Sequence, residues 1–590
     1  MQKYQLYYRL LFLVSGFFIA IESFSISFEK QQLPEDYEYV TVRDGHLFLN
    51  NERIRFWGAI GTFPGQNYED NLAVVQRLKK LGFNMIRFWE NPNQYENYTK
   101  GDMSRMDRID HFLWCLKEEG FKVWYAGLQK VPQLTPEELK KIPYLREGNF
   151  DYVSLLERRQ GKLKVHKNIS LHWMDALRLY AISEMKKNAV HFNQHTGMRY
   201  CDDPLFAVWE ISNEEWWFGH VTGEVLKLDP YVQRVLIEKW NSFLREKYAS
   251  DKRLKKAWLG LLEGESLEKR SVMLLPLKTD TDPGAQRKAL GVNIQEGVSA
   301  SYGREDFNLQ RGEDVVEFFL QIWIESKQEI HDSIKTWGKS TRLCPIIWDT
   351  GIGYEIQSQF LHQQADAVVH STYLTGFHND NTHRRFPWIS RLEEPPSTCW
   401  GYPWLEQNKI EGKPFFVYET QIHNPAKYRV EFPMQLVSLA SINDWDIICW
   451  HYFGNVPDSK QEKPYSQALD YSSSEIEHPQ GLHYQYDEVQ LSAMMAASQI
   501  FRNFQLDPAT DPTTFIFGRK SLYDPASMDY AGSYKKTGNC FLPTTYRYGS
   551  RIKIDTSITE DKIIGPVIKR GVYEPNPYVP TPEIEYNWNQ

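Results

Sequence analysis

Two glutamates at the ends of apolar runs are the side chains of this sequence best placed to do chemistry together. The run that begins at Leu205 turns polar at Asn213 and Glu214. A second run begins at Pro414 and ends on Glu419. Such runs are typical of buried parallel strands, and barrel enzymes present catalytic groups at the ends of such strands. Two carboxylates aimed at one pocket could cleave a glycosidic bond, one as proton donor and the other as nucleophile or base. Taken alone, Glu214 could equally belong to a solvated acidic turn.

Together the two runs resemble a known family. Trp-Glu-Ile-Ser-Asn-Glu at 209–214, followed much later by Val-Tyr-Glu at 417–419, is similar to the motifs of the clan A glycoside hydrolases, in their cellulase- and mannanase-like (family 5-like) branch. The resemblance implies that Glu214 ends barrel strand 4 as the acid/base and that Glu419 ends strand 7 as the nucleophile. The clan often has proline after the acid/base, whereas this chain has Glu215. Glu215 is therefore a rival acid, ranked second because Glu214 directly follows the asparagine.

The resemblance also assigns residues that would bind the sugar or hold the nucleophile. Arg87, near the end of the second predicted strand, would hydrogen-bond the nucleophile, and a fixed guanidinium keeps a carboxylate ionised by lowering its pKa. An ordinary arginine at a strand end is the alternative. Asn213 would hydrogen-bond the sugar 2-hydroxyl, and Trp450, which ends the last predicted strand, would form the floor of the central sugar site.

Four further residues are expected to contact substrate. His370 and Tyr373 would face the cleaved sugar, but they lie three positions apart where the family commonly has two. At this spacing the two side chains need not face the same way, and a packed histidine is the alternative for His370. Trp216 and Trp217 follow the acid/base and are placed for sugar-binding subsites, unless one or both simply pack.

The elements that must position these residues alternate between strand and helix, which predicts a (β/α)8 TIM barrel with long loop insertions. The eight predicted strands lie at 55–60, 83–89, 121–127, 205–211, 343–348, 367–373, 414–419 and 445–450. The predicted helices lie at 71–81, 106–119, 173–194, 231–248, 251–261, 315–337, 354–364, 430–442 and 487–501. The excursions at 129–170, 262–311 and 374–413 are too long for plain connections, and such loops are usually functional or mobile.

Three regions are predicted along the chain. Residues 1–25 are expected to be a signal peptide and residues 26–505 the barrel. Within the latter, residues 38–50 form a hairpin that turns at Asp44 and Gly45. Residues 506–590 alternate in short runs, which predicts a small β-rich C-terminal appendage, either whole or incomplete.

Composition narrows the class of partner. The net charge is −8, which provides no basic footprint for nucleic acid. The six cysteines show no CxxC pattern, and no His-x-x-x-His spacing indicates a metal site. Cys115 and Cys449 are expected to be buried thiols, and any pairing of the other four is undecided. The expected partner is a carbohydrate substrate, and the chemistry needs no cofactor or metal.

The N-terminus predicts export. Lys3 and Arg9 precede an apolar run from Leu10 to Ile21, and small residues follow it. This is the pattern of a secretory signal peptide, and the apolar core is short for a membrane span. A secreted, periplasmic or cell-surface protein is expected, with no membrane contact unless the segment stays uncleaved as an anchor.

The combined prediction is a secreted, retaining hydrolase of a β-linked oligo- or polysaccharide. Two alternatives share the same residues: a non-catalytic carbohydrate-binding protein on the same barrel, and a transglycosylase. A retaining enzyme needs its two carboxyl groups roughly 5–5.5 Å apart, and an inverting one about 6.5–9.5 Å apart. The sequence does not indicate the sugar, the linkage, endo or exo action, or the oligomeric state.

Overall fold

The structure is a computed structural model, and all of its described helices and strands lie between Asp36 and Gln590. It describes residues 33–61, 64, 67–92, 103–129, 169–215, 230–274, 309–349, 356–374, 409–422, 429–451, 453, 484, 487–528 and 541–568. The predicted signal peptide and most of the three long excursions lie outside these residues.

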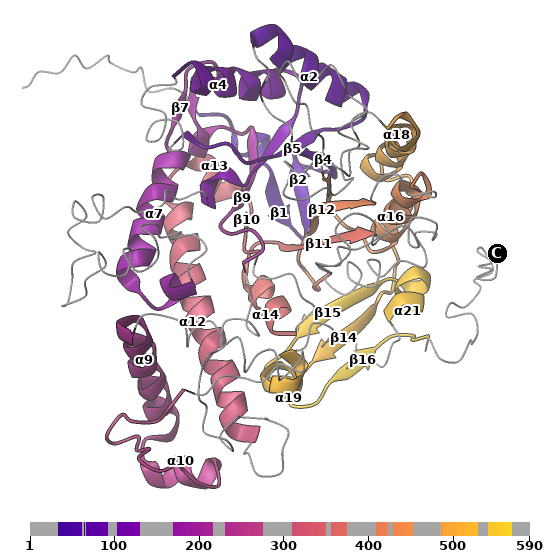
Figure 1. The fold of residues 1–590 in the computed structure, drawn as a ribbon. Coiled ribbons are helices and arrows are strands. Elements are labelled where there is room, and N and C mark those ends of the chain that lie inside the picture. Colours follow the sequence, from indigo (N-terminus) through magenta and orange to yellow (C-terminus); the bar gives the residue numbers. More distant parts are fainter. Residues whose placement is uncertain are drawn as a thin grey trace, which may run out of the picture. The chain divides into compact units, whose positions relative to one another are not determined.

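Eight parallel strands form the centre of the fold (Figure 1). In chain order they are β4 (Phe56–Ile60), β5 (Met85–Phe88), β6 (Lys122–Tyr125), β9 (Phe206–Glu210), β10 (Ile346–Ile347), β11 (Val368–Leu374), β12 (Phe415–Ile422) and β13 (Ile447–Trp450). Each strand pairs with its neighbours in this order from β4 to β10 and from β11 to β13, and β13 pairs with β4. A parallel bridge between Ile347 and Ala367 joins β10 to the residue before β11. The ring is therefore closed, and the predicted (β/α)8 barrel is confirmed.

The strands are apolar because both of their faces are covered. Every residue of β4, β5, β9, β12 and β13 is buried. A parallel strand buried between the barrel interior and an outer helix layer reads as a continuous apolar run rather than an alternating one. A charged residue inside such a strand therefore needs a polar partner. Three buried charged residues lie in these strands: Arg87 of β5, Glu210 of β9 and Glu419 of β12.

The helices follow the strands, close to their predicted positions. They are α2 (Tyr68–Lys80), α4 (Met103–Glu118), α7 (Asp175–Ala189), α9 (Pro230–Tyr248), α10 (Asp251–Ala257), α12 (Leu309–Lys335), α13 (Lys339–Leu343), α14 (Ile356–Gln364), α16 (Glu431–Ile442) and α18 (Glu488–Arg502). The prediction that a helix continues to residue 194 was wrong. The chain there forms a tight hairpin of β7 (Phe192–Asn193) and β8 (Met198–Arg199), whose turn holds Gly197 at a φ of 68°.

The predicted N-terminal hairpin is present and has a third strand. Strands β1 (Thr41–Arg43) and β2 (His46–Leu49) turn at Asp44 and Gly45, whose φ angles of 51° and 75° suit a tight two-residue turn. Strand β3 (Glu52–Arg53) pairs with β2.

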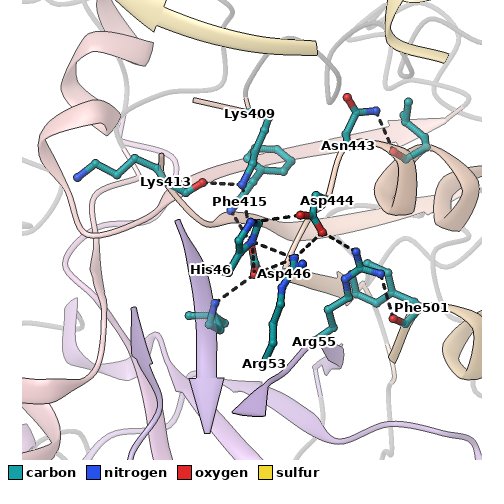
Figure 2. A network of polar contacts seen from close by, with 12 residues as sticks. His46, Arg53, Arg55, Lys409, Lys413, Phe415, Asn443, Asp444, Asp446 and Phe501 are labelled. Carbon is teal, nitrogen blue, oxygen red and sulfur yellow. Dashed lines mark hydrogen bonds and ion pairs between the residues drawn. The ribbon is translucent and has the colours of Figure 1, made fainter. Parts of the chain in front are cut away.

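A polar network ties this hairpin to the start of β13 (Figure 2). Asp446 accepts hydrogen bonds from the main-chain N–H groups of Leu47 and Phe415, at 3.2 and 3.3 Å. Asp444 accepts from Arg55 at 2.7 Å and also from Arg53. Because these carboxylates precede β13, the network lies at the N-terminal end of the strand, where barrels keep stabilising rather than catalytic residues.

A three-stranded sheet follows the barrel in sequence (yellow in Figure 1). Its strands are β14 (Thr513–Phe517), β15 (Ser550–Ile554) and β16 (Lys562–Ile564), with β14 in the middle. Helices α19 (Arg519–Tyr523) and α21 (Phe541–Tyr548) accompany them. The sheet joins the chain before β12 through a parallel bridge between Ile410 and Ile552.

Within the described ranges, no helix is long and apolar enough to cross a membrane. The same ranges contain four cysteines, all buried free thiols: Cys115, Cys201, Cys344 and Cys449.

Candidate active site

Arg87 joins three strands at the centre of the candidate site. It lies on β5 with its side chain fully buried. Nη1 donates to Oε1 of Glu419 at 2.8 Å, and Nη2 donates to Oδ1 of Asn213 at 2.5 Å. Nε and Nη2 both donate to the carboxylate of Glu210, at 2.9 and 2.7 Å. One guanidinium therefore brings together the predicted nucleophile, the predicted sugar-binding asparagine and a carboxylate of β9.

Glu210 is a site residue that the sequence reasoning missed. Besides Arg87, it accepts hydrogen bonds from Trp124 Nε1 and Gln129 Nε2, both at 2.7 Å. Burial raises the pKa of Glu210 above its usual value, and the charge and hydrogen bonds of Arg87 offset only part of this rise. A signal was available, because a glutamate inside the apolar run of a buried strand must meet a polar partner.

A β-bulge in β12 directs two consecutive side chains into the site. Along β11, His370 pairs with Val417 and Ser371 pairs with Glu419, so Tyr418 is the extra residue. The register toward β13 shifts at the same place. Consecutive strand residues normally point to opposite faces, but here Glu419 bonds to Arg87 and the Tyr418 ring lies 4.9 Å from the Arg87 guanidinium carbon.

Glu214 stands opposite the tip of this bulge. The Tyr418 hydroxyl lies 3.5 Å from Oε1 of Glu214 and donates to it. Burial raises the pKa of Tyr418 far above its usual value, so the hydroxyl keeps its proton. Glu214 and Asn213 are partly exposed, whereas Arg87 and Glu210 are fully buried. Glu214, the predicted acid/base, is therefore accessible to a substrate, whereas Arg87 and Glu210 are not.

Glu215, the rival acid, is held in an ion network instead. Its carboxylate lies 2.9 Å from His172 Nε2 and forms an ion pair with Lys327 Nζ. Burial raises the pKa of Glu215, but Lys327 and His172 together lower it to about 2. A general acid needs a raised pKa. Glu215 is therefore unsuited to donate a proton, and Glu214 is the better candidate.

The structure does not bring Trp450 to these groups. The Trp450 ring is fully buried and packs against Trp57 and Phe432, with ring centroids 5.2 and 5.4 Å away. Its neighbour Cys449 takes the other side of β13, where the charges of Arg87, Glu210 and Glu419 act on the thiol. Because side chains alternate along a strand, Trp450 points toward the outer helices. The expected sugar floor therefore has no support from this arrangement.

The remaining predicted residues are only partly visible. His370 is buried, and its Nδ1 lies 2.6 Å from the main-chain N of Ser371. Tyr373 lies on β11, but its side chain is outside the described residues. Trp216 and Trp217 also lie outside them. Among the residues that are described, no group of His, Cys, Asp and Glu could hold a metal ion.

Comparisons with known proteins find likeness at the level of the fold. No family model and no curated protein matches the sequence. The endo-β-1,4-mannanase of Thermotoga petrophila is similar in structure, with 12% identity over 79% of this chain and 80% of the mannanase, and a TM-score of 0.41. The β-galactosidase of the psychrophilic Marinomonas ef1 has 11% identity over 85% of this chain and 70% of its own, with a TM-score of 0.48. The endo-1,4-β-mannanase of Rhizomucor miehei has 12% identity over 79% of this chain and 99% of its own, with a TM-score of 0.41. At these identities and TM-scores the likeness concerns the fold alone, so activity must be inferred from the contacts within the site.

Proposed function

We propose that this protein is a glycoside hydrolase that cleaves a β-linked oligo- or polysaccharide with retention of configuration. The observation on which this proposal depends is the Arg87 cluster, which fixes Glu419 in the C-terminal half of β12 and Asn213 just beyond the C-terminal end of β9. Neither predicted glutamate is the last residue of its strand, because β12 continues to Ile422 and β9 ends at Glu210. A partly exposed Glu214 lies beside the Arg87 cluster and receives the Tyr418 hydroxyl. The carboxyl ends of the strands are where (β/α)8 enzymes carry their active sites.

In the first chemical step Glu419 attacks the anomeric carbon. A bond forms between a carboxylate oxygen of Glu419 and this carbon while the bond from the carbon to the leaving oxygen breaks, and Glu214 gives its proton to the leaving oxygen. The positive charge of Arg87, 2.8 Å from Oε1, favours the ionised carboxylate needed for attack. The products are a covalent glycosyl-enzyme and a released alcohol or sugar.

In the second step water replaces Glu419. Glu214, now ionised, takes a proton from the water as the water oxygen bonds to the anomeric carbon, and Glu419 leaves as a carboxylate. Two inversions at one carbon retain its configuration. Tyr418 supports this alternation, because a donated hydrogen bond stabilises the ionised form of Glu214.

Asn213 is oriented for the sugar. Because Arg87 Nη2 bonds to the amide oxygen, the position of oxygen and nitrogen in the Asn213 side chain is fixed. The amide nitrogen can then donate to the 2-hydroxyl of the sugar, a contact that strengthens in an oxocarbenium-like transition state. His370, Tyr373, Trp216 and Trp217 remain predicted substrate contacts. We further propose that residues 1–25 export the protein to its extracellular substrate.

The test is hydrolysis of a panel of β-linked polysaccharides and aryl β-glycosides by wild type, Glu419→Ala and Glu214→Ala. A matched control is Glu119→Ala, which removes a surface glutamate paired with Lys79. We expect wild type and control to turn over one sugar class, and Glu419→Ala to lose that turnover. Proton NMR during the reaction should show the β-anomer first; the α-anomer first would overturn retention.

The same experiment separates the alternatives. A carbohydrate-binding protein would turn over nothing, and its Glu419→Ala variant would bind the same glycan as the wild type, which would contradict the proposal. A transglycosylase would lose activity with Glu419→Ala too, but its main products would be longer saccharides rather than hydrolysed ones.

A further inference from the structure

The turn that carries Glu214 has a backbone conformation that needs support. The φ of Glu214 is 46°, in the left-handed region that residues other than glycine rarely adopt. We propose that Asp349, Lys327 and Glu215 are positioning residues that hold Glu214 in this conformation, and that proton transfer by Glu214 depends on them. The inference rests on the proposed function, in which Glu214 is the acid/base.

Asp349 supports the turn from the end of β10. Its Oδ2 accepts the main-chain N–H of Glu214 at 2.7 Å. Its main-chain oxygen accepts from the Ser212 hydroxyl at 3.0 Å and from the N–H of Glu215 at 3.4 Å. Asp349 is fully buried, and its Oδ1 has no hydrogen-bond partner within the described part of the chain. A buried carboxyl so placed is costly, which points to a role in holding the N–H of Glu214.

Lys327 clamps the turn from α12. Nζ donates to the Ser212 hydroxyl at 2.8 Å and forms an ion pair with Glu215. Ser212 and Glu215 flank the pair Asn213 and Glu214, so a single ammonium group spans the turn from one side to the other. The segment between the two anchored residues has little freedom to leave its conformation.

His172 completes the clamp on Glu215. Its Nε2 lies 2.9 Å from the Glu215 carboxylate, and its Nδ1 lies 2.6 Å from the hydroxyl of Ser326, the residue before Lys327. The imidazole also stacks on Trp323 of the same helix, with ring centroids 3.9 Å apart. Glu215 is therefore fixed by two groups that are themselves fixed, as a positioning device requires.

The two carboxylates of the proposed reaction are held by different groups. Arg87 holds Glu419 and also Asn213, whereas Asp349 and Lys327 hold the backbone and the flanking residues of the turn of Glu214. Loosening the turn should therefore impair protonation of the leaving group more than nucleophilic attack. Glycosides of strongly acidic alcohols need no such protonation, so the chemical nature of the leaving group distinguishes the two effects.

The experiment compares two substrates of the sugar class that the wild type hydrolyses. One is a β-glycoside with a 2,4-dinitrophenyl leaving group, and the other has an unactivated alcohol. For Lys327→Met and Asp349→Ala we expect kcat/KM to fall about 100-fold on the unactivated substrate, as a misplaced catalytic group does, and to fall much less on the dinitrophenyl one. Asp349→Asn should keep most of the activity, because its amide oxygen can still accept the N–H of Glu214.

Lys247→Met is the matched control. Lys247 forms ion pairs with Asp314, at 2.8 Å, and with Glu317, and it lies on α9 and not at the turn. The Lys247→Met substitution should leave the ratio of the kcat/KM values for the two substrates unchanged. Should Lys327→Met fail to fold, Glu215→Gln and Asp349→Ala test the same clamp. Equal loss on both substrates, or wild-type behaviour of Asp349→Ala and Lys327→Met, would overturn the inference.

Two outcomes separate this inference from the proposed function. If Glu214→Ala itself shows no dependence on the leaving group, the assignment of Glu214 as acid/base fails. A crystal structure of Asp349→Ala or Lys327→Met in which Glu214 keeps its positive φ would overturn the positioning role whatever the activity.

Discussion

Arg87 and Glu210 form a two-pronged ion pair in which both side chains are fully buried, with Nε–Oε2 at 2.9 Å and Nη2–Oε1 at 2.7 Å. This pairing uses one edge of the guanidinium and sets the direction of the rest. Nη1 is left aimed at Glu419. The nucleophile proposed here is thus held by a group whose own orientation depends on a second carboxylate.

We expect Glu210→Ala to lower the free energy of unfolding by about 3–5 kcal/mol, because it leaves a buried cation without its main partner. Urea unfolding measures this loss. Turnover should also fall, because Arg87 loses its orientation. Glu265→Ala is a matched control: Glu265 is also buried and accepts two hydrogen bonds from one arginine, from Nη1 and Nη2 of Arg311 at 3.0 and 2.6 Å. The Glu265→Ala variant should lose a similar amount of stability but keep the wild-type kcat. Equal turnover in the two variants would argue against a positioning role for Glu210.

Tyr418→Phe removes the hydroxyl that the β-bulge presents to Glu214. We expect kcat/KM to fall about fivefold, which corresponds to about 1 kcal/mol for one hydrogen bond. Steady-state kinetics on an unactivated substrate would measure it. Tyr484→Phe is the control, since the buried Tyr484 hydroxyl donates to the main-chain oxygen of Trp450 at 3.2 Å and not to a proposed catalytic group. The idea fails if both variants behave alike.

Gly58→Ala tests the close contact between the first and last barrel strands. A Cβ at Gly58 would lie 2.5 Å from Sγ of Cys449, its partner across the pair of β4 and β13. We expect a loss of stability of about 1–3 kcal/mol from overpacking. Removing the sulfur in Gly58→Ala/Cys449→Ala should recover part of this loss, as thermal or urea unfolding of all four proteins of the cycle would show. Strict additivity of the two changes would contradict the clash.

Lys409 should make the stability of the protein increase with pH in the alkaline range. Burial lowers the pKa of Lys409 to about 8 from the usual 10.5, against the opposing charge of Asp446. Between these pH values the unfolded chain binds more protons than the folded protein, so raising the pH favours folding. We expect the free energy of unfolding of wild type, minus that of Lys409→Met, to increase from about pH 8 to about pH 10.5. A difference that stays flat, or falls, over this window would contradict the lowered pKa.

Local patterns predicted the barrel well, because each strand and helix carries its own apolar signature. The eight strands and most helices lie within a few residues of their predicted bounds, and Arg87 does contact Glu419. What the patterns missed depends on contacts between distant segments. The bulge at Tyr418 depends on how β12 pairs with β11 and β13, and the clamp by Lys327 depends on the contact of α12 with the turn. Neither the bulge nor the clamp can be predicted from the residue spacing within a single segment. Trp450 shows the opposite case, in which a motif position matched the family but the side chain packs outward.

Hydrogen bonds to the main chain of β15 connect the C-terminal sheet to the barrel. Ile552 of β15 donates to the carbonyl oxygen of Lys409 and accepts from the N–H of Glu411, both at 2.8 Å. Gln363 of α14 exchanges two further bonds with the main chain of Ile554, each at 3.0 Å. Melting this sheet would strip hydrogen-bond partners from the barrel itself. We therefore expect calorimetry to record one cooperative transition for both parts, so that unfolding of the C-terminal strands sets the thermal limit of the whole protein and the strands do not behave as a detachable module.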